Sequence, residues 1–81
     1  MFENLKKLKQ LKEIQNSLAQ EKIEIQKEGI KVIMNGKMEI EEIQLNPQLD
    51  YSRQSEVLKK CINEAFKKMQ ILAAQKMMQH M

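Results

Sequence analysis

The chain has 81 residues, of which 42% are hydrophobic, enough for one small folded domain and too many for a disordered chain. With one Cys, one His and no Trp, it excludes an internal disulfide and argues against a cysteine metal cage or a Ser-His-Asp triad. We therefore expect a single domain over residues 1–81 that is not an enzyme and uses no cofactor, metal or small-molecule substrate. Such a short chain buries little core, so we expect a partner, most simply a second copy, to cover part of its apolar surface.

No apolar run approaches the roughly 20 residues that a membrane-spanning helix requires. The start of the chain leads into a lysine-rich amphipathic stretch, which is not typical of a signal peptide. We therefore expect a cytoplasmic protein that makes no membrane contact.

Residues 2–20 are predicted to form an amphipathic helix. Their apolar side chains recur every three or four positions, and no Gly or Pro interrupts them. These apolar residues are Leu5, Leu8, Leu11, Ile14 and Leu18.

Residues 21–49 change to an alternation of apolar and polar side chains, which predicts strands. A turn signal lies at residues 27–29, and Asn35-Gly36 is a strong hairpin signal. We expect three antiparallel strands that form a meander with one apolar face.

In the last predicted strand, the apolar residues move from even-numbered positions (Met38, Ile40) to odd-numbered positions (Ile43, Leu45) across Glu41-Glu42. One extra residue restores the apolar face, so this switch predicts a β-bulge. Asn46-Pro47 then ends the strand, because proline cannot donate a ladder hydrogen bond.

Residues 52–78 are predicted to form the second amphipathic helix, with Asp50 or Ser52 as its N-cap and Glu56 in its first turn. Its apolar stripe consists of Leu58, Cys61, Ile62, Ala65, Phe66, Met69, Leu72 and Ala73. The fold class is therefore α+β, an α-β-β-β-α protomer with the meander between two amphipathic helices.

Five residues of this stripe are assigned to the core or to a dimer seam, with Phe66 as the anchor. They are Leu58, Ile62, Ala65, Phe66 and Met69. Cys61 is expected to be a small buried hydrophobe, with a redox cross-link between protomers as the alternative. His80 is expected to be solvated.

Both predicted helices carry an excess of Lys, whereas the strand region carries an excess of Glu. The candidate DNA-binding residues are Lys6, Lys7, Lys9, Lys12, Lys59, Lys60, Lys67 and Lys68. The last four form two pairs eight residues apart, so we expect both pairs on one side of the second helix. A basic helical face binds polyanions through phosphate contacts, although exposed lysines are also common on ordinary solvated faces.

One Arg and three aromatic residues offer little for reading base edges or stacking on unpaired bases. Contact with the duplex backbone at low sequence specificity is therefore the expected mode. The alternative is a dimeric protein–protein interaction module that uses exposed apolar, Met-rich helix faces.

Residues 29–47 resemble the central hairpin of the YbaB/EbfC family of bacterial nucleoid-associated proteins. That family shows a V-K-V-x-x-N-G hairpin and a strand that ends in I-D-P. Ile30-Lys31-Val32 and Asn35-Gly36 match the first motif, and Leu45-Asn46-Pro47 matches the second with Asn in place of Asp. Residues 62–66 loosely resemble the A-A-F-N-D-A region of the family's last helix.

The resemblance implies a tweezer-like homodimer of α-β-β-β-α protomers that binds double-stranded DNA with little sequence preference at the nucleoid. The family usually has a Gly-rich run before the hairpin, whereas this chain has only Gly29 there. This difference implies a tighter first turn.

Overall fold

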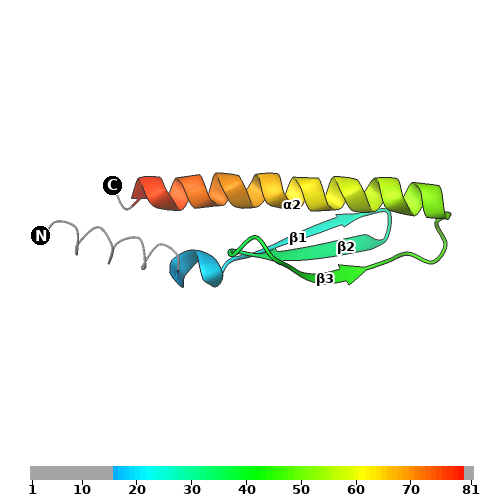
Figure 1. The fold of residues 1–81 in the computed structure, drawn as a ribbon, viewed down its shortest axis with the longest axis horizontal. Helices are drawn as coiled ribbons and strands as arrows, with labels where there is room; N and C mark the ends of the chain where they lie inside the picture. Colours follow the sequence, from blue (N-terminus) through cyan, green and yellow to red (C-terminus); the bar gives the residue numbers. More distant parts are fainter. Residues whose placement is uncertain (1–15, 80–81) are drawn as a thin grey trace, which may run out of the picture.

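The computed structural model describes residues 16–79, which form one long helix packed on a small sheet. After a helical segment at residues 16–19 come β1 (Lys22–Lys27), β2 (Ile30–Asn35), β3 (Ile40–Gln44) and α2 (Tyr51–Gln79). Helix α2 runs along the three strands and continues past them beside residues 16–19 (Figure 1). The predicted α+β class and the meander are confirmed, and the first helix falls within the described residues only from residue 16.

The strands pair antiparallel in the order β1-β2-β3. The two residues between β1 and β2 both have positive φ, 48° at Glu28 and 82° at Gly29. This conformation is typical of the type I′ turn, whose twist matches the twist of the strands that it joins. The tight first turn implied by the sequence is therefore confirmed.

The connection from β2 to β3 is longer than a two-residue turn, although it follows Asn35-Gly36 as predicted. The Asn35 Oδ1 atom accepts hydrogen bonds from the backbone N–H groups of Lys37 (2.9 Å) and Glu39 (3.2 Å). Gly36 is required by close packing, because an added Cβ would lie 1.4 Å from the Leu18 carbonyl oxygen. Glycine here lets the loop touch the backbone that precedes β1.

The β-bulge predicted in β3 is confirmed. Ile33 of β2 pairs with Glu42, whereas the next residue, Met34, pairs with Ile40. Glu41 is therefore the extra residue, and it brings Ile40 and Ile43 to the same face of the sheet.

The core lies between α2 and the two strands β1 and β2. Its buried residues are Ile25, Ile30, Val32, Met34, Val57, Cys61, Ala65 and Met69. The prediction is confirmed for Ala65 and Met69, which are at most 1% exposed. Leu58, Ile62 and Phe66 only pack against this core and stay half-buried, so Phe66 is not its centre.

The start of α2 confirms Asp50 as the N-cap, because the Arg53 N–H donates to the Asp50 carboxylate at 2.7 Å. The placement of Glu56 in the first turn is wrong, since α2 begins at Tyr51 and its first turn has no acidic residue. Arg53 also binds the Glu28 carboxylate of the β1–β2 turn through two nitrogens. This pair attaches the start of α2 to the end of β1.

Asn46, in the connection between β3 and α2, also links the β1–β2 turn to the start of α2. Its side-chain amide donates to the Glu28 carbonyl at 2.9 Å, and its backbone N–H donates to the Gln54 side chain at 2.8 Å. Gly29 leaves room for this amide, because an added Cβ would lie 2.7 Å from the Asn46 nitrogen. The register of α2 over β1 is thereby held at its N-terminal end.

Candidate nucleic-acid interface

Four lysines meet in a shallow groove of about 560 Å³ on the β1 side of α2. We call this the lysine groove. Its lining residues are Lys27, Lys60, Asn63, Glu64, Lys67, Lys68 and Ile71.

The helical repeat explains how α2 supplies its part of the groove. Lys60 and Lys67 are seven residues apart, which is nearly two full turns and about 10.5 Å along the axis. Arg53 lies a further seven residues towards the N-terminus on the same flank, where it binds Glu28. Lys27 comes from the end of β1, which the turn contacts with α2 hold beside the helix.

Glu64 is the acidic residue in the groove and lies between two of its lysines. Its carboxylate is 3.0 Å from the Lys27 Nζ atom and 3.7 Å from the Lys68 Nζ atom. The hydrogen bond with Lys27 lowers the pKa of Glu64 and raises the pKa of Lys27. Both groups are therefore charged at neutral pH.

Lys60 and Lys67 make no ion pair with any residue of the described range 16–79. Against four lysines the groove holds one carboxylate, so it keeps a net charge of +3. A concave surface with this excess attracts polyanions and is suited to phosphate groups.

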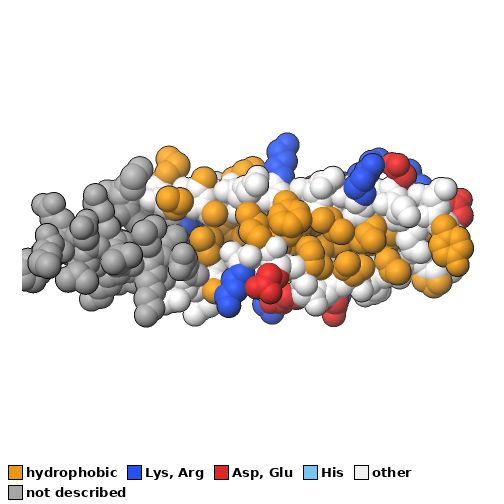
Figure 2. All heavy atoms as spheres, in the orientation of Figure 1, with side chains coloured by type: hydrophobic (Ala, Val, Ile, Leu, Met, Phe, Trp, Pro, Cys, Tyr) orange, Lys and Arg blue, Asp and Glu red, His pale blue; other side chains and the backbone are white. Residues whose placement is uncertain are grey.

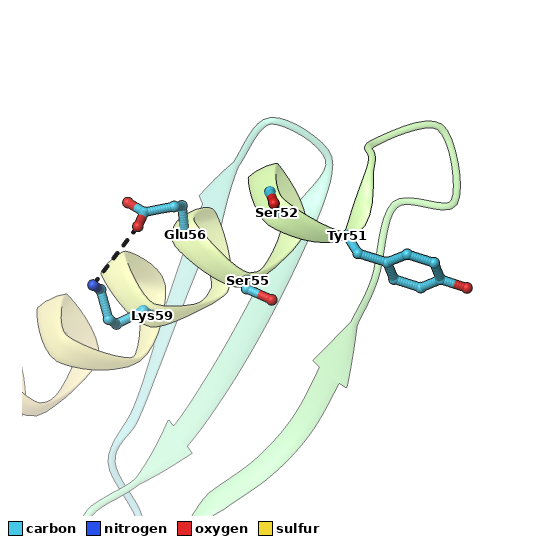
Figure 3. A pocket seen from close by; sticks show the side chains of 5 residues that line it. All are labelled: Tyr51, Ser52, Ser55, Glu56 and Lys59. Atoms are coloured by element: carbon cyan, nitrogen blue, oxygen red, sulfur yellow. Dashed lines mark ion pairs between the residues drawn. The ribbon is translucent and has the colours of Figure 1, made fainter.

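Lys59 lies elsewhere, so the prediction that both lysine pairs share one side of α2 is wrong. Lys59 and Lys68 are nine residues apart, which places them half a turn out of phase. Lys59 instead lines a hollow with Tyr51, Ser55 and Glu56, whose carboxylate is 3.9 Å from its Nζ atom (Figure 3). The tyrosine ring points away from this hollow and is 91% exposed (Figure 3).

The other candidate lysines, Lys6, Lys7, Lys9 and Lys12, lie outside the described residues. So does His80. Their expected roles stay predictions.

A band of exposed and half-buried apolar side chains lies on the opposite, β3-facing flank of α2 (Figure 2). Helix α2 covers β1 and β2 and leaves β3 largely uncovered. Ile43 is 44% exposed although its pairing with buried Val32 places it on the helix-facing side of the sheet. We call this surface the apolar band, which consists of Leu58, Ile62 and Phe66 of α2, Ile40 and Ile43 of β3, and Leu45.

The sulfur groups of α2 differ in exposure. Cys61 is fully buried, as expected for a small hydrophobe, and burial raises the pKa of its thiol. Met77 and Met78 are more than half exposed. Within residues 16–79, no group of three His, Cys, Asp or Glu side chains is placed to hold a metal ion, and no helix is long and apolar enough to cross a membrane.

Sequence patterns did not single out Val57 of the core, most of the groove lining, or Arg53 on the same flank of α2. Val57 is 1% exposed and belongs to the core. Lys27 enters the groove from a strand, which no helical spacing on α2 could reveal. Arg53 had a usable signal, since it precedes Lys60 and Lys67 at the same interval of seven.

Comparison with known proteins places the chain in a family. It has no match among the curated proteins or the solved structures with which it was compared. The model of the YbaB/EbfC DNA-binding family, by contrast, matches residues 1–81, the whole chain. The match includes the elements that carry the lysine groove and the apolar band. The chain therefore belongs to the YbaB/EbfC DNA-binding family.

Proposed function

We propose that the protein binds duplex DNA at the nucleoid as a homodimer, mainly through phosphate contacts and with low sequence specificity. The observation that carries this proposal is the lysine groove, in which Lys60 and Lys67 have no anionic partner among the described residues. Membership of a DNA-binding family supports DNA as the polyanion that binds in this groove.

The groove supports phosphate contact rather than base readout. Lysine is a point charge on a flexible stem, whereas specific base contacts usually use the planar fork of arginine or an amide. The single arginine, Arg53, is already bound to Glu28, and Asn63 is the one amide in the groove. Contacts of this kind position a protein on the backbone without reporting the base sequence.

The apolar band supports the homodimer. A monomeric soluble protein rarely exposes a continuous apolar surface, and a second copy is the simplest partner for a chain with so small a core. Because the band and the lysine groove lie on opposite flanks of α2, a twofold pair joined at the bands keeps both grooves accessible. Each dimer then offers two grooves to DNA, one on each outer side, so its total charge for DNA binding exceeds that of one chain.

The test is a mobility-shift comparison of three proteins on several unrelated duplexes. Lys60→Glu/Lys67→Glu reverses two charges in the groove, whereas the control Lys59→Glu/Lys37→Glu reverses two exposed charges outside it. We expect the groove variant to lose at least tenfold in affinity on every duplex, and the control to stay within about threefold of wild type. Equal losses in both variants would contradict the assignment of the groove.

The apolar band also fits a second candidate function, a protein–protein interaction module that holds a partner helix. DNA binding, measured on a protein whose mass is known from light scattering, separates the two. A dimer that binds DNA at low salt supports the nucleoid function. A dimer that does not bind DNA favours the interaction module.

A further inference from the structure

Glu64 lies beside two of the four lysines that could bind a phosphate in the groove. Among the seven residues that line the lysine groove it is the one anion. Its two carboxylate oxygens divide between two cations, with Oε2 3.0 Å from Lys27 and Oε1 3.7 Å from Lys68. A DNA phosphate that binds here would form ion pairs with these same two ammonium groups.

The ion pairs of Glu64 do little to hold the fold together. The side chains of Glu64, Lys27 and Lys68 are 34%, 43% and 55% exposed, and exposed ion pairs contribute little to stability. The attachment of β1 to α2 already rests on the buried core and on the contacts of Arg53 and Asn46 with Glu28. Glu64 is thus not needed for positioning the helix over the strands.

The carboxylate does change the electrostatics of the groove. While Glu64 is ionised, Lys27 and Lys68 have a partner within the chain and neutralise fewer DNA phosphates, so fewer of the cations condensed on the DNA are released when the protein binds. Only Lys60 and Lys67 are left without such a partner among the described residues. The negative charge also repels a phosphate that approaches either of its two lysines.

We propose that Glu64 is an internal competitor of the DNA phosphates that limits both the affinity and the salt dependence of DNA binding. This inference rests on the proposed function, because it assigns a role within the same groove. Glu64 acts through Lys27 and Lys68 and has no need to touch DNA itself.

The test compares Glu64→Gln with Glu56→Gln. Both variants remove one negative charge from an exposed ion pair on α2, but Glu56 pairs with Lys59 outside the groove. Affinity for one duplex is measured across a series of salt concentrations. Each lysine freed to bind a phosphate steepens the slope of log K against log salt by about 0.9, which at 0.1 M salt corresponds to about an eightfold tighter complex.

For each groove that contacts DNA, we expect Glu64→Gln to steepen this slope by about 0.9 to 1.8 and to tighten binding by about 8-fold to 60-fold at 0.1 M salt. Glu56→Gln should change the affinity by less than about threefold and leave the slope unchanged. Equal gains in both variants would show an effect of net charge alone and would overturn the inference. Unchanged or weaker binding by Glu64→Gln, with an unchanged unfolding temperature, would overturn it as well.

The outcome for Glu64 is separable from the outcome for the proposed function. If Lys60→Glu/Lys67→Glu abolishes binding while Glu64→Gln behaves as wild type, the groove binds DNA and Glu64 does not compete. If neither change has any effect, the groove itself is not the DNA site.

Discussion

Replacing Ile43 and Leu45 with serine tests whether the apolar band joins two copies of the chain. Ile43 is 44% exposed and Leu45 is 50% exposed, so about half of each side chain is available for burial against a partner. Complete burial of such a side chain contributes about 1.5–3 kcal/mol, so half contributes about 1 kcal/mol. A twofold interface contains each residue twice, and the four half side chains together contribute about 4 kcal/mol.

Since about 1.4 kcal/mol corresponds to a factor of ten, the double variant should weaken the dimer by about a thousandfold. Sedimentation equilibrium over a wide range of protein concentrations measures this change directly. The matched control is Ile71→Ser, which replaces an apolar side chain of similar exposure (51%) on the opposite, groove-lining flank of α2.

We expect the control to associate as the wild type does. A double variant with an unchanged dissociation constant would refute the assignment of the band as the dimer interface. An equal loss in Ile71→Ser would refute it too, because general loss of apolar surface would then explain both results.

Three further predictions concern the fold. Met69→Ala removes a side chain that is 1% exposed and should lower the free energy of unfolding by about 2–5 kcal/mol in urea titrations; a loss under about 1 kcal/mol would place Met69 outside the core. Cys61 should react with a thiol reagent at pH 8 much more slowly in the native protein than in urea, since burial excludes the reagent and raises the thiol pKa; similar rates would contradict its burial. The hydrogen bond from Arg53 lowers the pKa of Glu28 below its ordinary value of 4.5. The stability that the ionised Glu28 contributes is therefore present above pH 4.5 and is lost as the pH falls through the lowered pKa. Glu28→Gln should therefore be less stable than wild type at pH 6, and the difference should vanish with acidification; a constant difference would contradict this linkage.

Local patterns in the sequence were sufficient to predict most of the sheet. The parity switch at Glu41-Glu42 located the bulge, because only one extra residue can return the apolar side chains to one face. The turn signal at residues 27–29 located the first turn, and the comparison with the family's Gly-rich run implied that it is tight, which the two positive φ values confirm. The length of the β2–β3 loop was not predictable, because Gly36 serves a close contact with Leu18, which is distant in sequence.

The interface was harder to predict, because its residues come from different elements. Counting eight positions between lysine pairs placed Lys59 with Lys68, although the helical repeat separates them by half a turn. Lys27 joins the groove only because the β1–β2 hairpin folds back beside α2. Phe66 is likewise only half-buried because α2 leaves β3 largely uncovered. The spacing of apolar residues within α2 gives no information about the position of β3.

The salt dependence of DNA binding by wild type and by Lys60→Gln/Lys67→Gln tests the central claim most directly. Removing two phosphate contacts from each groove should make the slope of log K against log salt shallower by about 1.8 for each groove that contacts DNA. The account predicts this change in slope together with weaker binding to all sequences alike. A slope identical to that of wild type would contradict the claim that Lys60 and Lys67 bind the phosphate backbone.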